Sequence, residues 1–291
     1  ACLHPHRGSP PGPGGGGRAG GGGGGPPIAE RFLKVLHWLH MHNRNARILG
    51  CPPLSTMVQT LAKPAGAVRY YYEIEQGTDE WHAVRRGLIT ASAVKALLTP
   101  TGKTANNASS RTHLLKLLAE RLTGESEASF YNDDMARGHL LEPYARDLYS
   151  QHYAPVAECG FITRELEGCT IGYSPDGLVG DDGLIEIKSR LAKHHLAALL
   201  ADEMPEEYQL QVQTGLAVTG RQWCDFISYT PGLPLFVKRI KPDPITITQL
   251  IQAAKAAEEQ IAAMLTQFEL VSRQYPATEQ VHPETEGEII I

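Results

Sequence analysis

The sequence predicts a mixed α/β (α+β) fold in which helices flank a small mixed β-sheet. After Tyr70, segments with helical periodicity alternate with short apolar runs of strand length, and Gly, Pro and Asp residues separate them. Apolar residues make up 42% and charged residues 20% of the 291 residues, which is typical of globular proteins. A chain of this length can bury a substantial core without disulfide bonds.

Two helices are expected in the first half of this fold. Ser109 or Ser110 can cap a helix that continues through Leu122 and ends at Gly124. A second helix is expected from Gly138 to about Tyr153. The apolar face of the second helix is formed by Leu141, Tyr144, Ala145 and Leu148.

Short strands and further helices follow. The expected strands cover Glu158–Arg164, Thr170–Tyr173, Gly177–Gly180 and Leu184–Ser189. The next elements are helices at Lys193–Leu200 and Glu206–Val218, and a hairpin of Trp223–Tyr229 and Leu235–Ile240. A long helix from Thr246 to about Phe268 closes the fold, so helices and strands are interleaved as in α/β and α+β proteins.

The two ends of the chain differ from the middle in composition. Of the 29 glycines, 12 lie in the first 25 residues, and we expect residues 1–27 to be a disordered tail. Residues 28–69 are expected to form a short helical appendage and linker. The main domain is predicted to span residues 70–270, with a flexible tail at 271–291.

Charge, cysteines and hydropathy exclude several classes of protein. Because 27 basic residues are outweighed by 32 acidic ones, the chain is not a basic protein that coats nucleic acid indiscriminately. Five cysteines without a C-x-x-C pair indicate neither a disulfide framework nor a zinc or iron–sulfur cluster, so a reducing cytoplasm is expected. No apolar stretch approaches the roughly 18 residues that a membrane-spanning helix needs.

One predicted hairpin carries several ionisable residues. The Asp-Asp-Gly segment at 181–183 fits a three-residue hairpin loop with its glycine in the left-handed conformation. If Gly180 pairs with Leu184, this register places Asp176 opposite Lys188. We therefore expect the Asp176 carboxylate and the Lys188 ammonium group to lie opposite each other, at the end of the hairpin away from its loop.

The second strand of this hairpin concentrates charge on one face. Glu186 and Lys188 point to one side of the strand, while Ile185 and Ile187 point to the other. Glu186 and Asp176 form a pair of carboxylates on this face, beside Lys188. Such a pair is normally stable only with a proton or a cation between the two groups. A site for Mg²⁺ or Mn²⁺ is one interpretation. The other is a surface hairpin with a Glu/Lys cross-strand pair.

Asp176, followed ten positions later by Glu186-x-Lys188, is similar to the PD-(D/E)XK nuclease signature. The chain around it resembles the phage lambda exonuclease and YqaJ-type viral recombinase family over about 170 residues, from Tyr70 to Ile240. The matching segments are Glu75–His82, Arg85, Gly87, Ile89–Ser92, Ala136–Gly138, Glu142, Ala145–Arg146, Ser174–Gly177, Glu186–Lys188 and Tyr208–Gln213. The resemblance implies a restriction-endonuclease-like core.

The resemblance also implies a metal-dependent active site. Asp176 and Glu186 would ligate Mg²⁺, which Mn²⁺ can replace, and the Ile187 carbonyl is a further ligand. Lys188 would position the attacking water. Glu142 matches a helical acidic residue that assists the metal site directly or through water, and is counted with the metal ligands.

Other positions match residues that line the site or bind DNA in this family. Gln211 corresponds to a helix glutamine that lines the site, and belongs with the catalytic residues. Arg85 and Ser92 correspond to residues that bind the 5′-terminal phosphate. Some relatives carry one more acidic residue where this chain has Leu166.

The sequence alone also allows structural roles for these residues. Glu142 could be a first-turn residue favoured by the helix dipole, and Ser92 could be the N-cap of a helix at 93–98. Gln211 and Gln213 are two positions apart on a helix, so both cannot face the site. Among neighbouring residues, we expect Trp81 and Tyr208 to lie in the core and His194 and His195 to be solvated.

The resemblance implies a Mg²⁺-dependent deoxyribonuclease that digests double-stranded DNA from a 5′ end in phage- or prophage-type recombination. It further implies a ring-shaped homotrimer and a single-strand-annealing partner protein. An endonuclease or repair nuclease on the same fold is an alternative, since fold and catalytic residues do not fix end specificity. A catalytically silent DNA-binding module is another, although the presence of Asp176, Glu186 and Lys188 together favours an enzyme.

Overall fold

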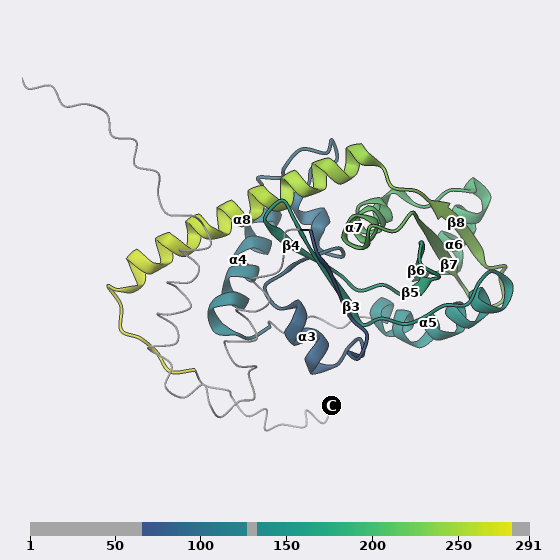
Figure 1. The fold of residues 1–291 in the computed structure, drawn as a ribbon, viewed down its shortest axis with the longest axis horizontal. Helices are drawn as coiled ribbons and strands as arrows, with labels where there is room; N and C mark the ends of the chain where they lie inside the picture. The colour runs from purple at the N-terminus through teal and green to yellow at the C-terminus, as the bar shows by residue number, and fades with distance from the viewer. Residues whose placement is uncertain (1–65, 127–132, 281–291) are drawn as a thin grey trace, which may run out of the picture. The chain divides into compact units, whose positions relative to one another are not determined.

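The computed structural model describes residues 66–126 and 133–280. The predicted tail at 1–27, nearly all of the appendage at 28–69 and the end of the C-terminal tail lie outside these residues. In the described part, eight strands are distributed over two four-stranded sheets, and helices pack against both (Figure 1). This arrangement confirms the predicted α/β class, with the expected mixed sheet distributed over two sheets.

The first sheet has the strand order β1-β3-β4-β2. Its strands are β1 (Val68–Tyr71), β2 (Ile89–Thr90), β3 (Phe161–Leu166) and β4 (Cys169–Tyr173). Strand β3 is antiparallel to both β1 and β4, whereas β2 is parallel to β4 with Ile89 beside Ile171. Because β2 and β4 run in the same direction, the residues that follow them leave the sheet at the same end.

The second sheet has the strand order β5-β6-β7-β8. Its strands are β5 (Gly177–Val179), β6 (Gly183–Ser189), β7 (Trp223–Tyr229) and β8 (Phe236–Ile240). The central pair β6–β7 is parallel, and both outer pairs are antiparallel. Strand β5 covers only the first part of β6, so the later residues of β6 have a free edge on that side.

The helices of the described part other than α3 lie close to their predicted positions. They are α3 (Asp79–Arg85), α4 (Ala108–Thr123), α5 (Asp133–His152), α6 (Ala192–Ala201), α7 (Gln209–Thr219) and α8 (Pro244–Ser272), with short 3₁₀ helices η1 (Val94–Leu97) and η2 (Glu206–Tyr208). Helix α4 ends at Gly124 as predicted, but its N-cap is Asn107 and not a serine. Ser110 instead completes the capping box with Asn107.

Helix α5 differs from its prediction in its start and in its buried face. It begins at Asp133, so Gly138 lies inside the helix and does not start it. Ala145 and Tyr149 are fully buried, whereas Tyr144, expected on the apolar face, is 62% exposed. The prediction for Tyr144 is therefore wrong, because the face that packs on the second sheet runs through its neighbour Ala145.

Two apolar cores, together with a small cluster of Ala198, Phe226 and Phe236, hold the sheets and helices together. In the larger core, residues of α4, α7 and α8 pack against the first sheet, with Ile162 and Ile171 at its centre. In the smaller core, α5 packs on Ile185, Ile187 and Ile227 of the second sheet. Helix α7 contacts strands of both sheets, and therefore fixes one sheet with respect to the other. None of the described helices has the length and apolar character needed to cross a membrane.

The hairpin between β5 and β6 has a different loop from the one predicted. Val179 pairs with Gly183, and Gly180–Asp182 form the loop, in which Gly180 is the left-handed residue at φ 50°. The prediction that Gly183 is left-handed is therefore wrong. Gly183 is needed for another reason, because a Cβ at this position would lie 2.2 Å from ring atoms of Trp223.

The register of this hairpin is shifted by two residues from the predicted one. It places Asp176 level with Glu186, so the predicted pairing of Asp176 with Lys188 is wrong. A shift of two residues keeps every side chain on its predicted face. Ile185 and Ile187 accordingly lie in the smaller core, and Glu186 and Lys188 share the opposite face. The negative charge of Glu186 accordingly acts on the Asp176 carboxyl group.

Gly183→Ala is expected to destabilise the protein by about 1–3 kcal/mol, because the added methyl group overpacks against Trp223. Gly138→Ala is the matched control, since a Cβ there meets nothing within 4 Å, and it should be neutral or stabilise by up to about 1 kcal/mol. Urea unfolding followed by circular dichroism measures both variants. Equal stability of the two would contradict the packing argument.

Candidate active site

The turn before β5 holds the Asp176 carboxylate at the free edge of β6. Asp176 Oδ2 accepts a hydrogen bond from the Ile187 backbone N–H at 2.5 Å. Gln76 donates to the Pro175 carbonyl at 2.8 Å, and Arg146 of α5 donates to the Asp176 carbonyl at 2.9 Å. The main chain around Asp176 is therefore fixed from two sides, which leaves its carboxylate little freedom to move away from β6.

Glu186 is fully buried and accepts hydrogen bonds from three side chains. Its Oε1 contacts Lys188 Nζ at 2.6 Å and Gln211 Nε2 at 2.5 Å, and its Oε2 accepts from the Tyr173 hydroxyl at 2.9 Å. The structure thus brings Gln211 and Lys188 to the carboxylate as the resemblance implied. Tyr173 was not predicted as part of the site. It directly precedes the Ser-Pro-Asp segment, which is one of the segments that indicated the site.

Glu142 approaches the carboxylate pair from α5. It lies well inside this helix, so the alternative role as a first-turn residue is wrong. Arg146, one turn later, forms an ion pair with Glu142. Burial raises the pKa of Glu142; the charges of Arg146 and Lys188 oppose this shift, and the charge of Glu186 adds to it. Glu142 is therefore electrostatically coupled to the site.

The carboxylates and Lys188 influence each other strongly. Burial, followed by the negative charges of Glu186 and Glu142, raises the pKa of Asp176 well above its usual range. Burial lowers the pKa of Lys188, but the carboxylates of Glu186 and Asp176 outweigh it and raise the pKa overall. Lys188 is therefore charged at neutral pH, and its single charge faces several carboxylates. Such a site attracts a further cation.

The donor atoms at this edge fit Mg²⁺. Asp176 and Glu186 supply carboxylate oxygens, and the Ile187 carbonyl points to the same edge as its N–H because both groups of a strand residue face the same side. In residues 66–126 and 133–280, no three His, Cys, Asp or Glu side chains form a metal cage by themselves. Mg²⁺ usually keeps waters and substrate phosphates beside one or two carboxylates, so two carboxylates suffice. Leu166, where some relatives have an acidic residue, packs against the larger core.

The residues of α7 near the site separate as predicted. Gln211 contacts Glu186, whereas Gln213 points away, donating to the Lys241 carbonyl at 2.9 Å and accepting from the Asp243 N–H at 2.7 Å. Tyr208, just before α7, stacks on Phe226 with 5.3 Å between ring centroids. Gln213 therefore has a structural role, in joining α7 to the start of α8.

A cation lies beside the carboxylate site. Arg85, the last residue of α3, donates to Ser174 Oγ at 2.6 Å, and its guanidinium carbon lies 3.8 Å from the centroid of the Trp81 ring. Trp81 Nε1 donates to the same Ser174 oxygen at 3.0 Å. Burial lowers the pKa of Arg85 to about 10, opposed by the charge of Glu120. No carboxylate in the described part of the chain forms an ion pair with Arg85, so its charge is available to an anion.

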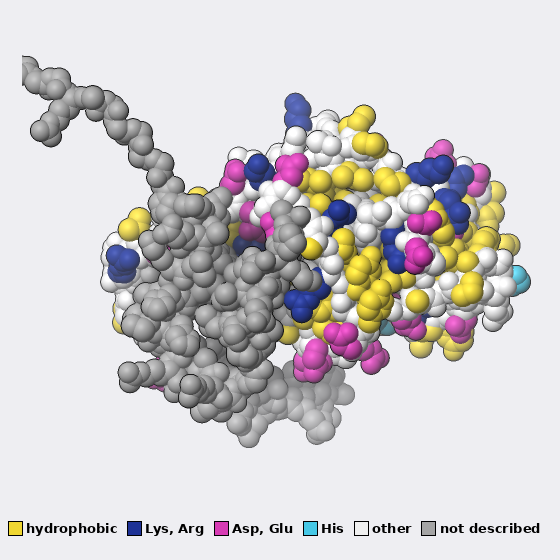
Figure 2. Space-filling model, in the orientation of Figure 1, with side chains coloured by type: hydrophobic (Ala, Val, Ile, Leu, Met, Phe, Trp, Pro, Cys, Tyr) yellow, Lys and Arg dark blue, Asp and Glu magenta, His cyan; other side chains and the backbone are white. Residues whose placement is uncertain are grey.

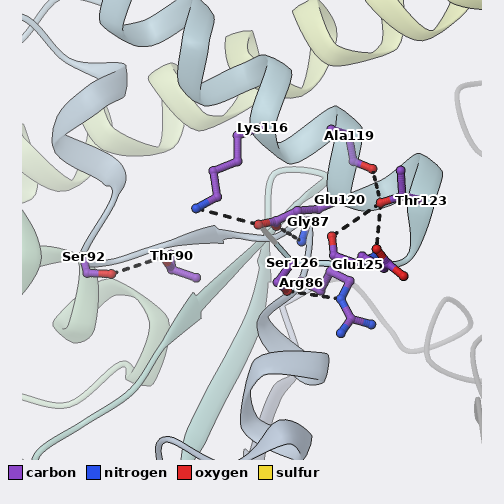
Figure 3. A network of polar contacts seen from close by, with 10 residues as sticks. All are labelled: Arg86, Gly87, Thr90, Ser92, Lys116, Ala119, Glu120, Thr123, Glu125 and Ser126. Atoms are coloured by element: carbon purple, nitrogen blue, oxygen red, sulfur yellow. Dashed lines mark hydrogen bonds and ion pairs between the residues drawn. The ribbon is translucent and has the colours of Figure 1, made fainter. Parts of the chain in front are cut away.

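Ser92 lies at the same end of the first sheet as Ser174. It follows β2 as Ser174 follows β4, and the parallel pairing of these strands continues with the hydrogen bond from Ala91 N–H to the Gly172 carbonyl at 2.9 Å. Ser92 is exposed, with its hydroxyl 3.4 Å from that of Thr90 (Figure 3). The alternative role as a helix N-cap is wrong, because η1 begins after Ala93 and has no side-chain cap.

His195 departs from its predicted environment. We expected it to be solvated with His194, but its side chain is fully buried. Its ring nitrogens lie 2.9 Å from Ser228 Oγ and 3.0 Å from the Pro234 carbonyl. These partners come from β7 and from the connection to β8, so His195 fixes α6 to the second sheet. A local sequence pattern does not reveal partners that are more than 30 residues away.

Comparison with known proteins agrees with this geometry. The model of the YqaJ-like viral recombinase domain matches residues 80–222. The solved structure of the alkaline exonuclease LHK-Exo from Laribacter hongkongensis is 36% identical, with a TM-score of 0.60, and the match covers 68% of this chain and 99% of that chain. LHK-Exo in complex with dAMP is also 36% identical, with a TM-score of 0.56 and coverage of 68% and 97%. The search of curated proteins finds no match.

The fold, the buried carboxylate–lysine site and these similarities define a nuclease. More narrowly, the chain belongs to the family of YqaJ-like viral recombinase domains, as the resemblance in its sequence indicated.

Proposed function

We propose that this nuclease is a Mg²⁺-dependent exonuclease that digests double-stranded DNA from the 5′ end. One observation carries the proposal: the guanidinium of Arg85, which forms no ion pair with a carboxylate of the described residues, is bound to Ser174, and Ser174 is two residues from Asp176. The hydroxyl group that holds the Arg85 guanidinium and a candidate metal ligand thus stand on one short segment. This arrangement suits a terminal phosphate and the adjacent phosphodiester bond bound at the same time.

Asp176, Glu186 and the Ile187 carbonyl are the residues proposed to hold Mg²⁺, with Glu142 assisting, and Mn²⁺ is expected to substitute. When bound, the ion stabilises the charge that develops on the phosphate and on the leaving oxygen, and lowers the pKa of bound water. The proposal is supported by the burial of Asp176 and by the crowding of carboxylates around it, which together raise its pKa.

The remaining residues of the site orient the reactants. Lys188 is charged and remains within hydrogen-bonding distance of Glu186, so we propose that it orients the attacking water and offsets negative charge in the transition state. Gln211 and Tyr173 each donate to Glu186, and hold its two oxygens in fixed directions. Pre-organised donors of this kind contribute without reorganisation during the reaction.

Arg85, Ser92 and Ser174 are proposed to bind the 5′-terminal phosphate. A terminal phosphate monoester carries nearly one more negative charge than an internal diester, which favours a cation without its own carboxylate. We expect this nuclease to release mononucleotides, and the complex of LHK-Exo with dAMP, a mononucleotide, supports this expectation. Recombination of phage or prophage type is the corresponding process, as the family name suggests.

The partners implied by the resemblance complete the proposal. We propose a ring-shaped homotrimer around the DNA, a single-strand-annealing partner protein and a reducing cytoplasmic setting. The free thiols of Cys159, Cys169 and Cys224 support that setting. On the face shown in Figure 2, acidic and basic side chains are interspersed around a hydrophobic area. That distribution agrees with DNA recognition at a specific site, and not through a uniformly basic surface.

Glu186→Gln is expected to reduce Mg²⁺-dependent cleavage of linear duplex DNA by about a hundredfold or more, because it removes the charge but retains the volume of the side chain. DNA affinity and melting temperature should change little. Glu203→Gln is the matched control at an exposed carboxylate and should retain full activity. Full activity of Glu186→Gln in Mg²⁺ would refute the assignment of the site.

Arg85→Ala is expected to slow cleavage of 5′-phosphorylated duplex by about ten- to a hundredfold, since a hydrogen bond to a charged group is worth roughly 1.5–3 kcal/mol. The loss on 5′-hydroxyl ends should be much smaller. Arg111→Ala, at an exposed arginine of α4, is the control. Equal losses on both ends would show that Arg85 is a general phosphate clamp or a structural residue. Equal wild-type rates on both ends would favour the endonuclease alternative.

A further inference from the structure

The turn between α3 and β2 is held by polar contacts from the end of α4. The Gly87 N–H donates to Glu120 Oε2 at 2.7 Å, and the Gly87 carbonyl accepts from Arg121 Nε at 2.8 Å. Arg86 Nε donates to Ser126 Oγ at 3.2 Å (Figure 3). Both polar groups of Gly87 are thus occupied by two consecutive residues of one helix.

Glycine is required at this turn, and α4 closes tightly upon it. Gly87 has a φ of 67°, and a Cβ there would lie 2.6 Å from Arg121 Cγ. Arg121 also makes a two-pronged ion pair with Glu258 of α8, with both nitrogen–oxygen distances at 2.7 Å. The turn is therefore anchored through α4 to α8. It lies between Arg85, which ends α3, and Ser92, which follows β2.

Glu120 combines this contact with an unusual environment for a carboxylate. Its residue exposure is only 8%, and its second oxygen lies 4.0 Å from Lys116 Nζ. Its charge acts on Arg85, where it opposes the effect of burial on the pKa. The two side chains nevertheless form no ion pair among the contacts of the described residues. Arg85 therefore has a nearby negative charge while its guanidinium remains available.

We propose that Glu120 is a positioning residue for the 5′-phosphate site. It fixes the Gly87 turn that joins Arg85 to Ser92, and it holds a negative charge near Arg85 without occupying its guanidinium. The inference rests on the proposed function, in which Arg85 and Ser92 bind the terminal phosphate. It adds that this site depends on a residue that does not touch the DNA.

The test measures dissociation constants for a hairpin duplex whose single end carries a 5′-phosphate or a 5′-hydroxyl, in EDTA so that no cleavage occurs. Glu120→Ala should reduce the preference for the phosphorylated end by about tenfold, which corresponds to about 1.4 kcal/mol. Glu120→Gln keeps an acceptor for Gly87 and should retain most of the preference. Glu120→Asp keeps the charge but shortens the reach, so it should lose preference, and it serves if the alanine variant does not fold.

Two further comparisons separate positioning from general loosening of α4. Leu114→Ala removes a buried side chain of the same helix, and should lower the melting temperature without changing the end preference. In an Arg85→Ala background, Glu120→Ala should cause no further loss of preference, because it acts through Arg85. An equal loss in Leu114→Ala, or independent losses for Glu120 and Arg85, would overturn the inference.

The outcome is distinguishable from a failure of the proposed function. A wild-type protein that prefers phosphorylated ends but cleaves no DNA with Mg²⁺ or Mn²⁺ would refute the proposed exonuclease and leave the role of Glu120 intact. A wild-type protein with equal affinity for both ends would overturn the inference itself, whatever its cleavage activity.

Discussion

The fully buried carboxylate of Glu186 is the constraint on which the rest of the site depends. A buried charge is tolerated only when it is well paired and hydrogen-bonded, and its three donors come from three different elements. Tyr173 is the last residue of β4 in the first sheet, Lys188 lies on β6 of the second sheet, and Gln211 lies on α7. Loss of any of these contacts exposes the cost of burying the charge. The packing of both sheets with α7 therefore supplies the hydrogen-bond donors that the buried Glu186 carboxylate needs. The same contacts define the candidate active site.

The neighbouring carboxylate of Asp176 makes that problem harder. Two acidic groups at the end of one hairpin repel each other, and the hydrogen bond from the Ile187 N–H holds Asp176 in place despite this. Contacts to main-chain carbonyls from Gln76 and Arg146 fix the segment without neutralising its carboxylate. The molecule therefore spends stability on an arrangement that folding alone would not favour, as is common at functional sites.

The parts of this site that follow from local rules were predictable from the sequence. Alternation along a strand gave Glu186 and Lys188 the same face, and helical spacing separated Gln211 from Gln213. The errors arise where distant residues decide. The role of Gly183 comes from Trp223, whose ring occupies the space beside it, and no local turn rule reveals that contact. Tyr173 and Glu120 gave no usable signal as site residues, because their importance comes from the partners that the tertiary fold brings to them.

The short segment from Ser174 to Asp176 has a consequence for how a nuclease of this design would measure its substrate. Its anion-binding end at Ser174 and its carboxylate end at Asp176 are separated by a single residue, and the main chain is fixed at Pro175 and Asp176. In the proposed function, the distance from a strand's end to the bond that is cut is therefore built into the backbone. Each cut then creates a new end that can occupy the same anion-binding position.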